Sequence, residues 1–310
     1  MAPFSKRFSA DQIPDLSEKV FVITGGATGI GYETTLALLH HNAKVYIASR
    51  SQSKFDEVLV KVKTILKASQ LDNLRFLKLD LSSIRDCARA ATRFLETEER
   101  LDCVVANAAL SIMPCVLSPD GYEIQFATNH LGHYAFISHL LPLVQHTSIK
   151  YNEARVVVVA SHAHAMYTPT SVDFDDLTIP KENDMTQVKD IPANTLAPSS
   201  QTSSTIGSST FGSDNSPGIP WWIKIASKAL VSITSVSPQA GALTSLMLAT
   251  DPDIVREGIM GKYFDVGPLG GKFFYGFSFE AEERLSVLAR DDEEGGKLMA
   301  WSEEVIKTLL

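Results

Sequence analysis

A glycine-rich run near the start of the chain, Lys19–Gly31 (KVFVITGGATGIG), constrains the fold more than any other feature. Its apolar part, 20–24, predicts a buried strand, and the glycines then lead into an amphipathic helix. Gly25, Gly29 and Gly31 let the chain reverse with positive φ, approach a pyrophosphate without a Cβ, and pack the helix closely on the strand. The first turn of such a helix carries free N–H groups and the positive end of its dipole, which stabilise a phosphate. The run therefore predicts a nucleotide-binding strand–turn–helix unit. The alternative is a tight turn that binds no ligand.

The alternation of strand and helix continues through the first half of the chain. Strands are expected at 20–24, 43–48, 74–79, 101–106 and 155–160, and helices at about 53–68, 82–97 and within 121–144. Such alternation is typical of a doubly wound, mainly parallel sheet with helices on both faces. A chain of 310 residues, 45% of them hydrophobic, can bury one such core, so a single Rossmann-like α/β domain is predicted over 1–310.

Particular side chains are expected at functional or buried positions of this fold. Ligands bind beyond the carboxyl ends of parallel strands. Residues at those ends are Gly25, Ser49, Asp80, Asn107 and Ser161. On the helix expected over 53–68, one apolar face predicts burial of Phe55, Val58, Leu59, Val62, Ile65 and Leu66.

The alternation stops in a segment rich in serine and threonine. Between 195 and 216, 12 of 22 residues are Ser or Thr, without helical or strand periodicity, so an irregular insertion is expected at about 185–218. A substrate lid and C-terminal helices are expected over about 219–310. Their elements are helices within 223–249, 280–289 and 296–309 and a strand at 261–266. Aromatic residues that suit either an apolar ligand or ordinary core packing are Trp221, Trp222, Phe273, Phe274, Tyr275, Phe277 and Phe279.

Charge and cysteine usage exclude several classes of partner. The formal net charge of −8 argues against nucleic acid or an anionic membrane. Cys87, Cys103 and Cys115 show no CxxC spacing, which favours reduced thiols in a cytoplasmic setting. No apolar run is long enough for a signal peptide or a membrane span. His162 and His164 lack the spacing and carboxylate neighbours of a metal site, so no metal is predicted.

The letters TGGATGIG resemble the TGxxxGIG fingerprint of the short-chain dehydrogenase/reductase family. The residues at its fixed positions are Thr24, Gly25, Gly29, Ile30 and Gly31. The more detailed likeness is to the fungal, retinol-dehydrogenase-like branch, and it covers 1–180 well and 220–270 moderately. The resemblance implies an NAD(P)-dependent oxidoreductase that acts on small molecules and forms a homo-oligomer.

The cofactor preference is predicted from the residues that follow the second strand. A carboxylate there would accept the ribose 2′-hydroxyl of NAD, whereas a cation suits the 2′-phosphate of NADP. This chain has Arg50 and Lys54 and no carboxylate before Asp56, which predicts NADP. The alternative is a solvated basic loop. The resemblance implies that Asp80 accepts a hydrogen bond from the adenine amino group, and the alternative is a helix cap with Ser82.

Three further residues carry roles that the resemblance implies. Asn107 opens NAAL, which resembles the family's NAAG with Leu110 in place of glycine, and it would steady the central strand and line the cofactor. Asn129, in TNHLGHY, would hold a water of a proton relay on its backbone carbonyl. Ser161, after VVVVA, would hydrogen-bond the substrate oxygen. The alternatives are an ordinary polar residue in a helix for Asn129 and a cap for Ser161.

The Tyr-x-x-x-Lys pair of the family is missing, since none of the eight tyrosines has a lysine four residues later. Lowering a tyrosine pKa from about 10 to about 7 takes roughly 4 kcal/mol of anion stabilisation, which that lysine helps to supply. Three explanations stay open. Tyr167 or Lys228 substitutes for the pair, or the chain binds NADP without redox chemistry, or 185–216 departs from the true sequence through a splice or reading-frame difference.

Together these features predict an NADP-dependent oxidoreductase that interconverts a hydrophobic secondary alcohol and a ketone. A role in fungal secondary metabolism, with a terpenoid-like substrate, follows from the resemblance alone. The alternative is an NADP-binding protein without dehydrogenase activity, which acts as a scaffold or as a non-redox enzyme.

Overall fold

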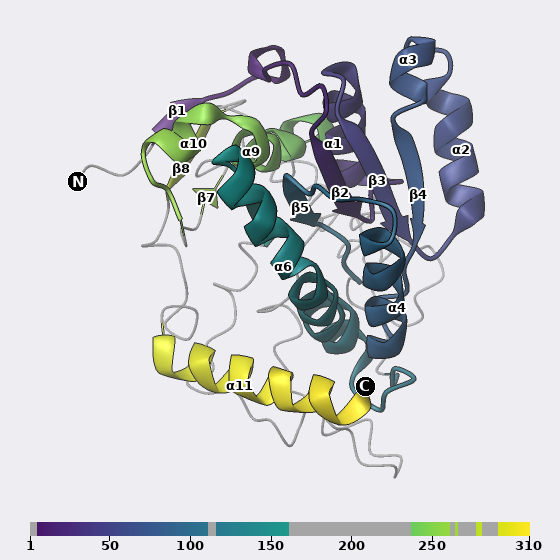
Figure 1. Cartoon of the computed structure of the whole chain (residues 1–310), viewed down its shortest axis with the longest axis vertical. Coiled ribbons are helices and arrows are strands. Elements are labelled where there is room, and N and C mark those ends of the chain that lie inside the picture. The colour runs from purple at the N-terminus through teal and green to yellow at the C-terminus, as the bar shows by residue number, and fades with distance from the viewer. Residues whose placement is uncertain (1–4, 111–115, 161–236, 261–263, 266–276, 281–290) are drawn as a thin grey trace, which may run out of the picture.

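The computed structural model describes residues 5–110, 116–160, 237–260, 264–265, 277–280 and 291–310. They form a parallel sheet with helices on both faces and a small antiparallel sheet beside it (Figure 1). This arrangement confirms the predicted doubly wound α/β fold.

The central sheet has five parallel strands. In the order in which they lie side by side, they are β4 (Leu74–Lys78), β3 (Lys44–Ser49), β2 (Val20–Thr24), β5 (Cys103–Ala106) and β6 (Arg155–Val158). The central strand β2 is buried at every position, because helices cover both of its faces. The chain leaves β2 toward β3 on one side and later returns to β5 on the other. The crevice at such a reversal, beyond the carboxyl ends of the strands, is where this class of fold binds ligands.

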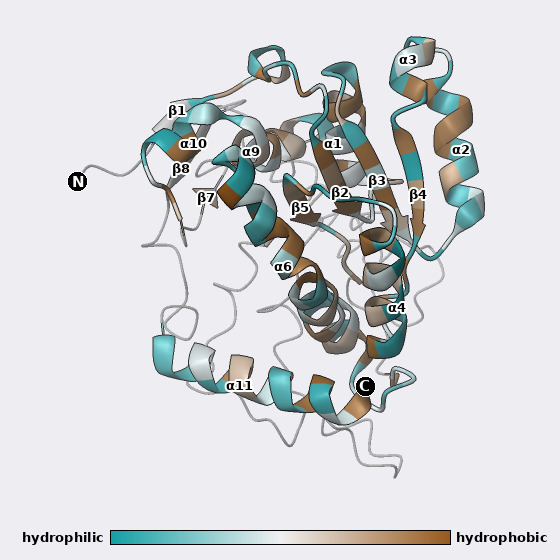
Figure 2. Cartoon of the chain, viewed as in Figure 1, coloured by the Kyte–Doolittle hydropathy of each residue, from teal (hydrophilic) through white to brown (hydrophobic). Residues whose placement is uncertain are grey.

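Two hydrophobic clusters hold the helices on the sheet. On one face lie α1 (Gly29–His40), α2 (Gln52–Val62) and α9 (Pro238–Thr250). On the other face lie α4 (Ile84–Leu95), α6 (Gly132–Tyr151) and α11 (Asp292–Leu309). Figure 2 shows mainly hydrophobic residues along the central strands, whereas hydrophobic and hydrophilic residues are mixed along α2 and α11. The layering therefore follows from apolar strands and one-sided helices.

Two of the helices expected in the first half of the chain have clearly different bounds in the structure. The helix expected over 53–68 ends at Val62, and a separate short helix α3 (Ala68–Leu71) follows. Beyond Val62 the chain turns, and the Leu66 N–H bonds back to the Val62 carbonyl at 2.8 Å. Leu66 is therefore buried, whereas Ile65 is 50% exposed, so the predicted burial of Ile65 is wrong.

The long helix expected within 121–144 is composite and extends further. It begins as α5 (Ile124–Phe126), passes through a π-helical turn η2 (Ala127–Leu131) and continues as α6 to Tyr151. Asn152 ends it in the left-handed conformation, with φ of 58°.

The small antiparallel sheet is not predicted from the sequence. Its strands, in spatial order, are β1 (Ser5–Arg7), β8 (Phe277–Glu280) and β7 (Phe264–Asp265). Phe277 and Phe279, expected in a lid, lie in β8, and the expected strand at 261–266 is described only as β7. The helix expected over 280–289 lies outside the described residues apart from Glu280, which ends β8.

The C-terminal helix α11 differs from the helix expected over 296–309 mainly at its first residue. The helix α11 begins four residues before the expected 296 because the Asp291 carboxylate caps it by accepting from the N–H groups of Glu293 and Glu294.

Two short helices, η1 (Ala10–Gln12) and α10 (Pro252–Arg256), complete the described elements. The insertion predicted at 185–218 lies outside the described residues, as do the aromatic residues expected in the lid apart from those in β8. No helix in the described ranges is long and apolar enough to cross a membrane.

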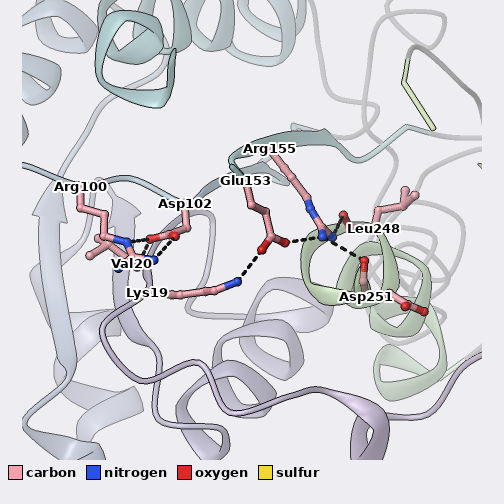
Figure 3. A network of polar contacts seen from close by, with 8 residues as sticks. All are labelled: Lys19, Val20, Arg100, Asp102, Glu153, Arg155, Leu248 and Asp251. Atoms are coloured by element: carbon pink, nitrogen blue, oxygen red, sulfur yellow. Dashed lines mark hydrogen bonds and ion pairs between the residues drawn. The ribbon is translucent and has the colours of Figure 1, made fainter. Parts of the chain in front are cut away.

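A network of ion pairs joins the amino-terminal edge of the sheet to the end of α9 (Figure 3). Arg155, at the start of β6, donates from Nη1 to the Leu248 carbonyl (2.8 Å) and from Nη2 to the Asp251 carbonyl (2.9 Å). Its guanidinium also pairs with Glu153, whose other oxygen accepts from Lys19 Nζ at 2.8 Å. These contacts dock the segment that follows residue 236 onto the sheet.

The buried thiols give a first testable prediction. Cys87 and Cys103 are both buried, and burial raises the pKa of Cys103 to about 12 and that of Cys87 above its ordinary value. Because the thiolate is the reactive form, we expect iodoacetamide at pH 8 to alkylate both residues at least about a hundredfold more slowly in the native protein than in urea. Peptide mass spectrometry measures each site separately, and fast native labelling of Cys103 would contradict its placement in β5.

Candidate functional site

A cleft of about 430 Å³ opens at the carboxyl ends of the central strands. Its walls come from the turn after β2, the ends of β3, β4 and β5, and the π turn η2. The cleft brings together most of the residues predicted to bind the cofactor. Those that line it are Gly25, Gly29, Ile30, Arg50, Lys54, Asp80 and Asn107. Gly31 does not line the cleft but packs behind it.

The turn after β2 approaches its neighbours too closely for side chains. Gly25 and Gly29 have φ of 67° and 55°, the left-handed region that favours glycine. A Cβ on Gly31 would lie 2.4 Å from the Gly25 carbonyl oxygen and 2.6 Å from Nδ2 of Asn107. The helix α1 begins at Gly29, and Thr28, Gly29 and Ile30 line the cleft, so its N-terminus is available to a phosphate.

The end of β3 presents two cations to the cleft. Arg50 and Lys54 both line it, and neither forms an ion pair with another described residue. The nearby Asp56 carboxylate instead accepts from the Gln52 amide at 2.9 Å. Lys78 on β4 donates to the Arg50 carbonyl, which fixes the backbone at this corner. The corner therefore carries positive charge that an anionic ligand can neutralise.

Two buried hydroxyl groups in the cleft also lack a partner in the described part of the chain. They belong to Ser49, at the end of β3, and to Thr128, in η2. Buried polar atoms are almost always hydrogen-bonded, so unpaired ones at a cleft wall indicate a position for a polar ligand. The cations, the helix N-terminus and these hydroxyls together fit a dinucleotide.

Asp80 lies at the cleft wall and also forms a local turn with Ser82, while its contact to adenine stays a prediction. It lines the cleft, and its Oδ1 accepts from the Ser82 N–H (3.0 Å) and hydroxyl (2.7 Å). A carboxylate has about four acceptor positions, so this local turn leaves acceptor capacity for a ligand. The cap of α4 itself is Ser83, whose Oγ accepts from the Asp86 N–H.

Thr24 ties the ends of the two central strands together. Its Oγ1 accepts from the N–H groups of Asn107 and Ala108, each at 2.9 Å, and Asn107 Nδ2 donates back to the Thr24 carbonyl at 3.0 Å. The same hydroxyl lies 2.8 Å from Nε2 of His133. Sequence reasoning missed His133, although it follows Asn129 by one helical turn within the TNHLGHY motif.

Asn129 lies in η2 and is buried, with both ends of its side chain used. Its Oδ1 accepts from the Leu110 N–H at 2.8 Å, and its Nδ2 donates to the Leu110 carbonyl at 3.0 Å. It thereby holds the loop after β5 at the position where leucine replaces the expected glycine. Its backbone carbonyl lies 3.0 Å from Nδ1 of His133. The water-holding role of this carbonyl stays a prediction.

The substrate side of the site is not covered by the structure. Ser161, Tyr167 and Lys228 all lie outside the described residues, and β6 ends at Val158. Within the described ranges, no group of three or more His, Cys, Asp or Glu residues is arranged to hold a metal ion.

Comparison with known proteins identifies a matching family and several relatives of this chain. A family model described as short chain dehydrogenase matches residues 19–173. The chain is 32% identical to an uncharacterized oxidoreductase of Schizosaccharomyces pombe, covering 83% of this chain and 80% of that protein. It is 28% identical to a short-chain dehydrogenase/reductase of Aspergillus calidoustus, covering 95% and 96%. An Armillaria gallica short-chain dehydrogenase/reductase is 40% identical, but the match spans only 54% of this chain and 53% of that one.

A solved structure supports the fold over nearly the whole length. The crystal structure of a putative uncharacterized protein from Mycobacterium paratuberculosis aligns with a TM-score of 0.62 and covers 97% of this chain and 98% of its own. Its sequence identity is 22%, so the likeness concerns the fold alone.

Proposed function

This chain belongs to the short-chain dehydrogenase/reductase family of oxidoreductases, and we propose that it uses NADP to interconvert a hydrophobic secondary alcohol and a ketone. The observation that carries the cofactor part of this proposal is the cleft at the carboxyl ends of the strands, where Arg50 and Lys54 have no anionic partner among the described residues. A charge-assisted contact to phosphate is worth roughly 1.5–3 kcal/mol, which corresponds to tenfold or greater preference for NADP over NAD.

In this proposal, different residues along the cleft bind different parts of the cofactor. Asp80 accepts from the adenine end, Arg50 and Lys54 hold the 2′-phosphate, and the N-terminus of α1 stabilises the pyrophosphate. Asn107 and Thr24 hold the strand ends beside the nicotinamide. A nicotinamide held in this cleft would supply or accept the hydride. Ser161 orients the substrate oxygen, and Tyr167 or Lys228 moves the proton.

The substrate class and setting are proposed from composition and from the family resemblance. The aromatic-rich segment 273–279 suits an apolar small molecule, and a place in fungal secondary metabolism follows from the resemblance to the fungal branch of the family. The sparse cysteines favour a cytosolic setting, and the family implies a homo-oligomer.

A second candidate function is favoured by one specific observation. No tyrosine in the sequence is followed four residues later by lysine, so the usual proton donor is missing. A chain that keeps the cofactor cleft without this pair could bind NADP and act as a scaffold or guide a non-redox reaction.

Titration with NADPH, and separately with NADH, tests the cofactor part of the proposal. We expect nicotinamide fluorescence to report at least about tenfold tighter binding of NADPH, because the 2′-phosphate meets two cations. Arg50→Ala should lower NADPH affinity about tenfold and leave NADH affinity unchanged. Lys63→Ala, an exposed lysine just beyond α2, is the matched control and should change neither affinity. Equal affinities for the two cofactors in the unmodified protein would contradict the assignment.

Turnover separates the two candidate functions. NADPH consumption with a panel of apolar ketones is expected if the chain is a dehydrogenase. Tight NADPH binding without consumption in either direction would favour the binding-only alternative.

A further inference from the structure

His133, the second residue of α6, is buried between the central strand β2 and the π turn η2. Both ring nitrogens have a partner: Nε2 lies 2.8 Å from Thr24 Oγ1, and Nδ1 lies 3.0 Å from the Asn129 carbonyl oxygen. Neither the cofactor contacts nor the proton transfer proposed above uses this side chain.

The hydrogen bonds around Thr24 determine which ring nitrogen carries the hydrogen. Thr24 Oγ1 already accepts two N–H groups, from Asn107 and Ala108, which occupy its two acceptor positions. Its own hydrogen is therefore donated to Nε2 of His133. Nδ1 then carries the ring hydrogen and donates it to the carbonyl of Asn129, which can only accept.

The surroundings keep this ring neutral. Burial lowers the pKa of His133 to about 4, and the ring interacts with no described carboxylate. The neighbouring His130 faces elsewhere: its Nε2 lies 2.9 Å from Ser302 Oγ in α11, and burial likewise lowers its pKa to about 4. A fixed neutral tautomer makes His133 a rigid connector with one donor and one acceptor.

Both groups that His133 connects support residues that line the cleft. Thr24 holds the backbone at Asn107 and Ala108, which line the cleft just after β5. Asn129 holds Leu110, further along the same loop, through its side chain and follows Thr128 of the π turn, and Leu110 and Thr128 line the cleft as well.

We propose that His133, as the neutral Nδ1–H tautomer, is a positioning residue that joins the end of β2 to the π turn and so holds the loop after β5 and the π turn in fixed positions at the cofactor cleft. Its effect on affinity rests on the proposed function, because the ligand proposed to bind in this cleft is the nicotinamide cofactor. The tautomer itself does not depend on any ligand.

The tautomer is tested on the protein without cofactor. Long-range proton–nitrogen NMR of protein labelled with ¹⁵N-histidine distinguishes protonated from unprotonated ring nitrogens, and loss of signals in His133→Gln assigns the residue. We expect a protonated Nδ1 and an unprotonated Nε2, unchanged from pH 5.5 to 8. An Nε2–H tautomer, or titration within that range, would overturn the assignment.

The positioning role is tested by NADPH titration of variants that keep different halves of the connection. His133→Leu removes both hydrogen bonds and should weaken NADPH binding at least about tenfold, the effect of losing one buried hydrogen bond. His133→Gln can accept from Thr24, and His133→Asn can donate to the Asn129 carbonyl, so each should recover part of the affinity. His139→Leu is the matched control, since His139 makes the same bond to the carbonyl four residues earlier on α6, whereas only His133 also bonds through Nε2 to Thr24.

The outcomes separate this inference from the proposed function. A folded His133→Leu variant that binds NADPH as tightly as the unmodified protein would overturn the positioning role. If His133→Leu does not fold, the NADPH affinities of His133→Gln and His133→Asn decide the question. Unchanged affinity in both of these variants would then overturn the positioning role. Failure of the unmodified protein to bind NADPH would refute the proposed function and with it the effect on affinity, whereas the NMR result would still decide the tautomer.

Discussion

Gly31→Ala is expected to weaken NADPH binding by roughly ten- to a hundredfold while the fold is retained. The new Cβ would lie 2.4 Å from the Gly25 carbonyl oxygen and 2.6 Å from Asn107 Nδ2. Neither neighbour yields easily, because the Gly25 N–H is bonded to the Ala48 carbonyl at 3.0 Å and Asn107 Nδ2 to the Thr24 carbonyl at 3.0 Å. Overpacking of this kind costs about 1–3 kcal/mol, and it would displace the turn and the first residues of α1, which are proposed to bind the pyrophosphate.

Gly295→Ala provides the matched control for this prediction. Gly295 lies inside α11, and a Cβ there would meet no atom within 4 Å. Alanine is the better helix former by about 0.8–1 kcal/mol, so this variant should bind NADPH normally and unfold at the same or a higher temperature. Fluorescence titration and thermal unfolding measure the two effects. Normal NADPH affinity in Gly31→Ala would show that the close approach of α1 to β5 is not needed for binding.

The sequence predicts the parts of the fold that local patterns determine. The strand at 20–24 is observed at those bounds because five apolar or small residues lie between a charged residue and a glycine turn. Elements that depend on distant partners are missed. The strands β1 and β8 pair although more than 250 residues separate them, and neither is long enough to show an alternating pattern. The bend after Val62 is likewise decided by packing of Leu66.

The same distinction applies to the site. The glycines, Arg50, Lys54, Asp80 and Asn107 could be named because each follows a recognisable strand, and parallel strands bring their ends together. The role of His133 could not be predicted in this way. It depends on the π turn, whose i to i+5 hydrogen bonding has no clear signal in the sequence. For Asn129 the family resemblance points to its backbone carbonyl, whereas the structure shows that its side chain holds Leu110.

Arg155→Met is expected to lower the free energy of unfolding by about 3 kcal/mol at pH 7. The Arg155 side chain is only 8% exposed, and its removal leaves the Leu248 and Asp251 carbonyls without these donors. Breaking a buried ion pair costs about 3–5 kcal/mol. The lower end of that range applies here, because Glu153 is 27% exposed and is still paired with Lys19 after the substitution. Urea unfolding followed by circular dichroism measures the change.

Arg256→Met is the matched control, because Arg256 also pairs with a carboxylate, that of Asp253 at 2.8 Å, but is 70% exposed. Exposed pairs are worth about 0–1 kcal/mol, so this variant should unfold within about 0.5 kcal/mol of the unmodified protein. Equal effects of the two substitutions would contradict the docking of α9 onto β6 through Arg155.

The pH dependence of the Arg155→Met effect separates its two causes. Burial raises the pKa of Glu153, but the hydrogen bond from Lys19 and the charge of Arg155 outweigh it, so the pKa is held below its ordinary value. A carboxylate with a lowered pKa stabilises the folded state above its unfolded pKa, and that contribution is lost as the pH falls through the folded one. The difference between Arg155→Met and the unmodified protein should therefore narrow as the pH falls below about 4. The part that persists at low pH measures the bonds from Arg155 to the two carbonyls, because these do not titrate.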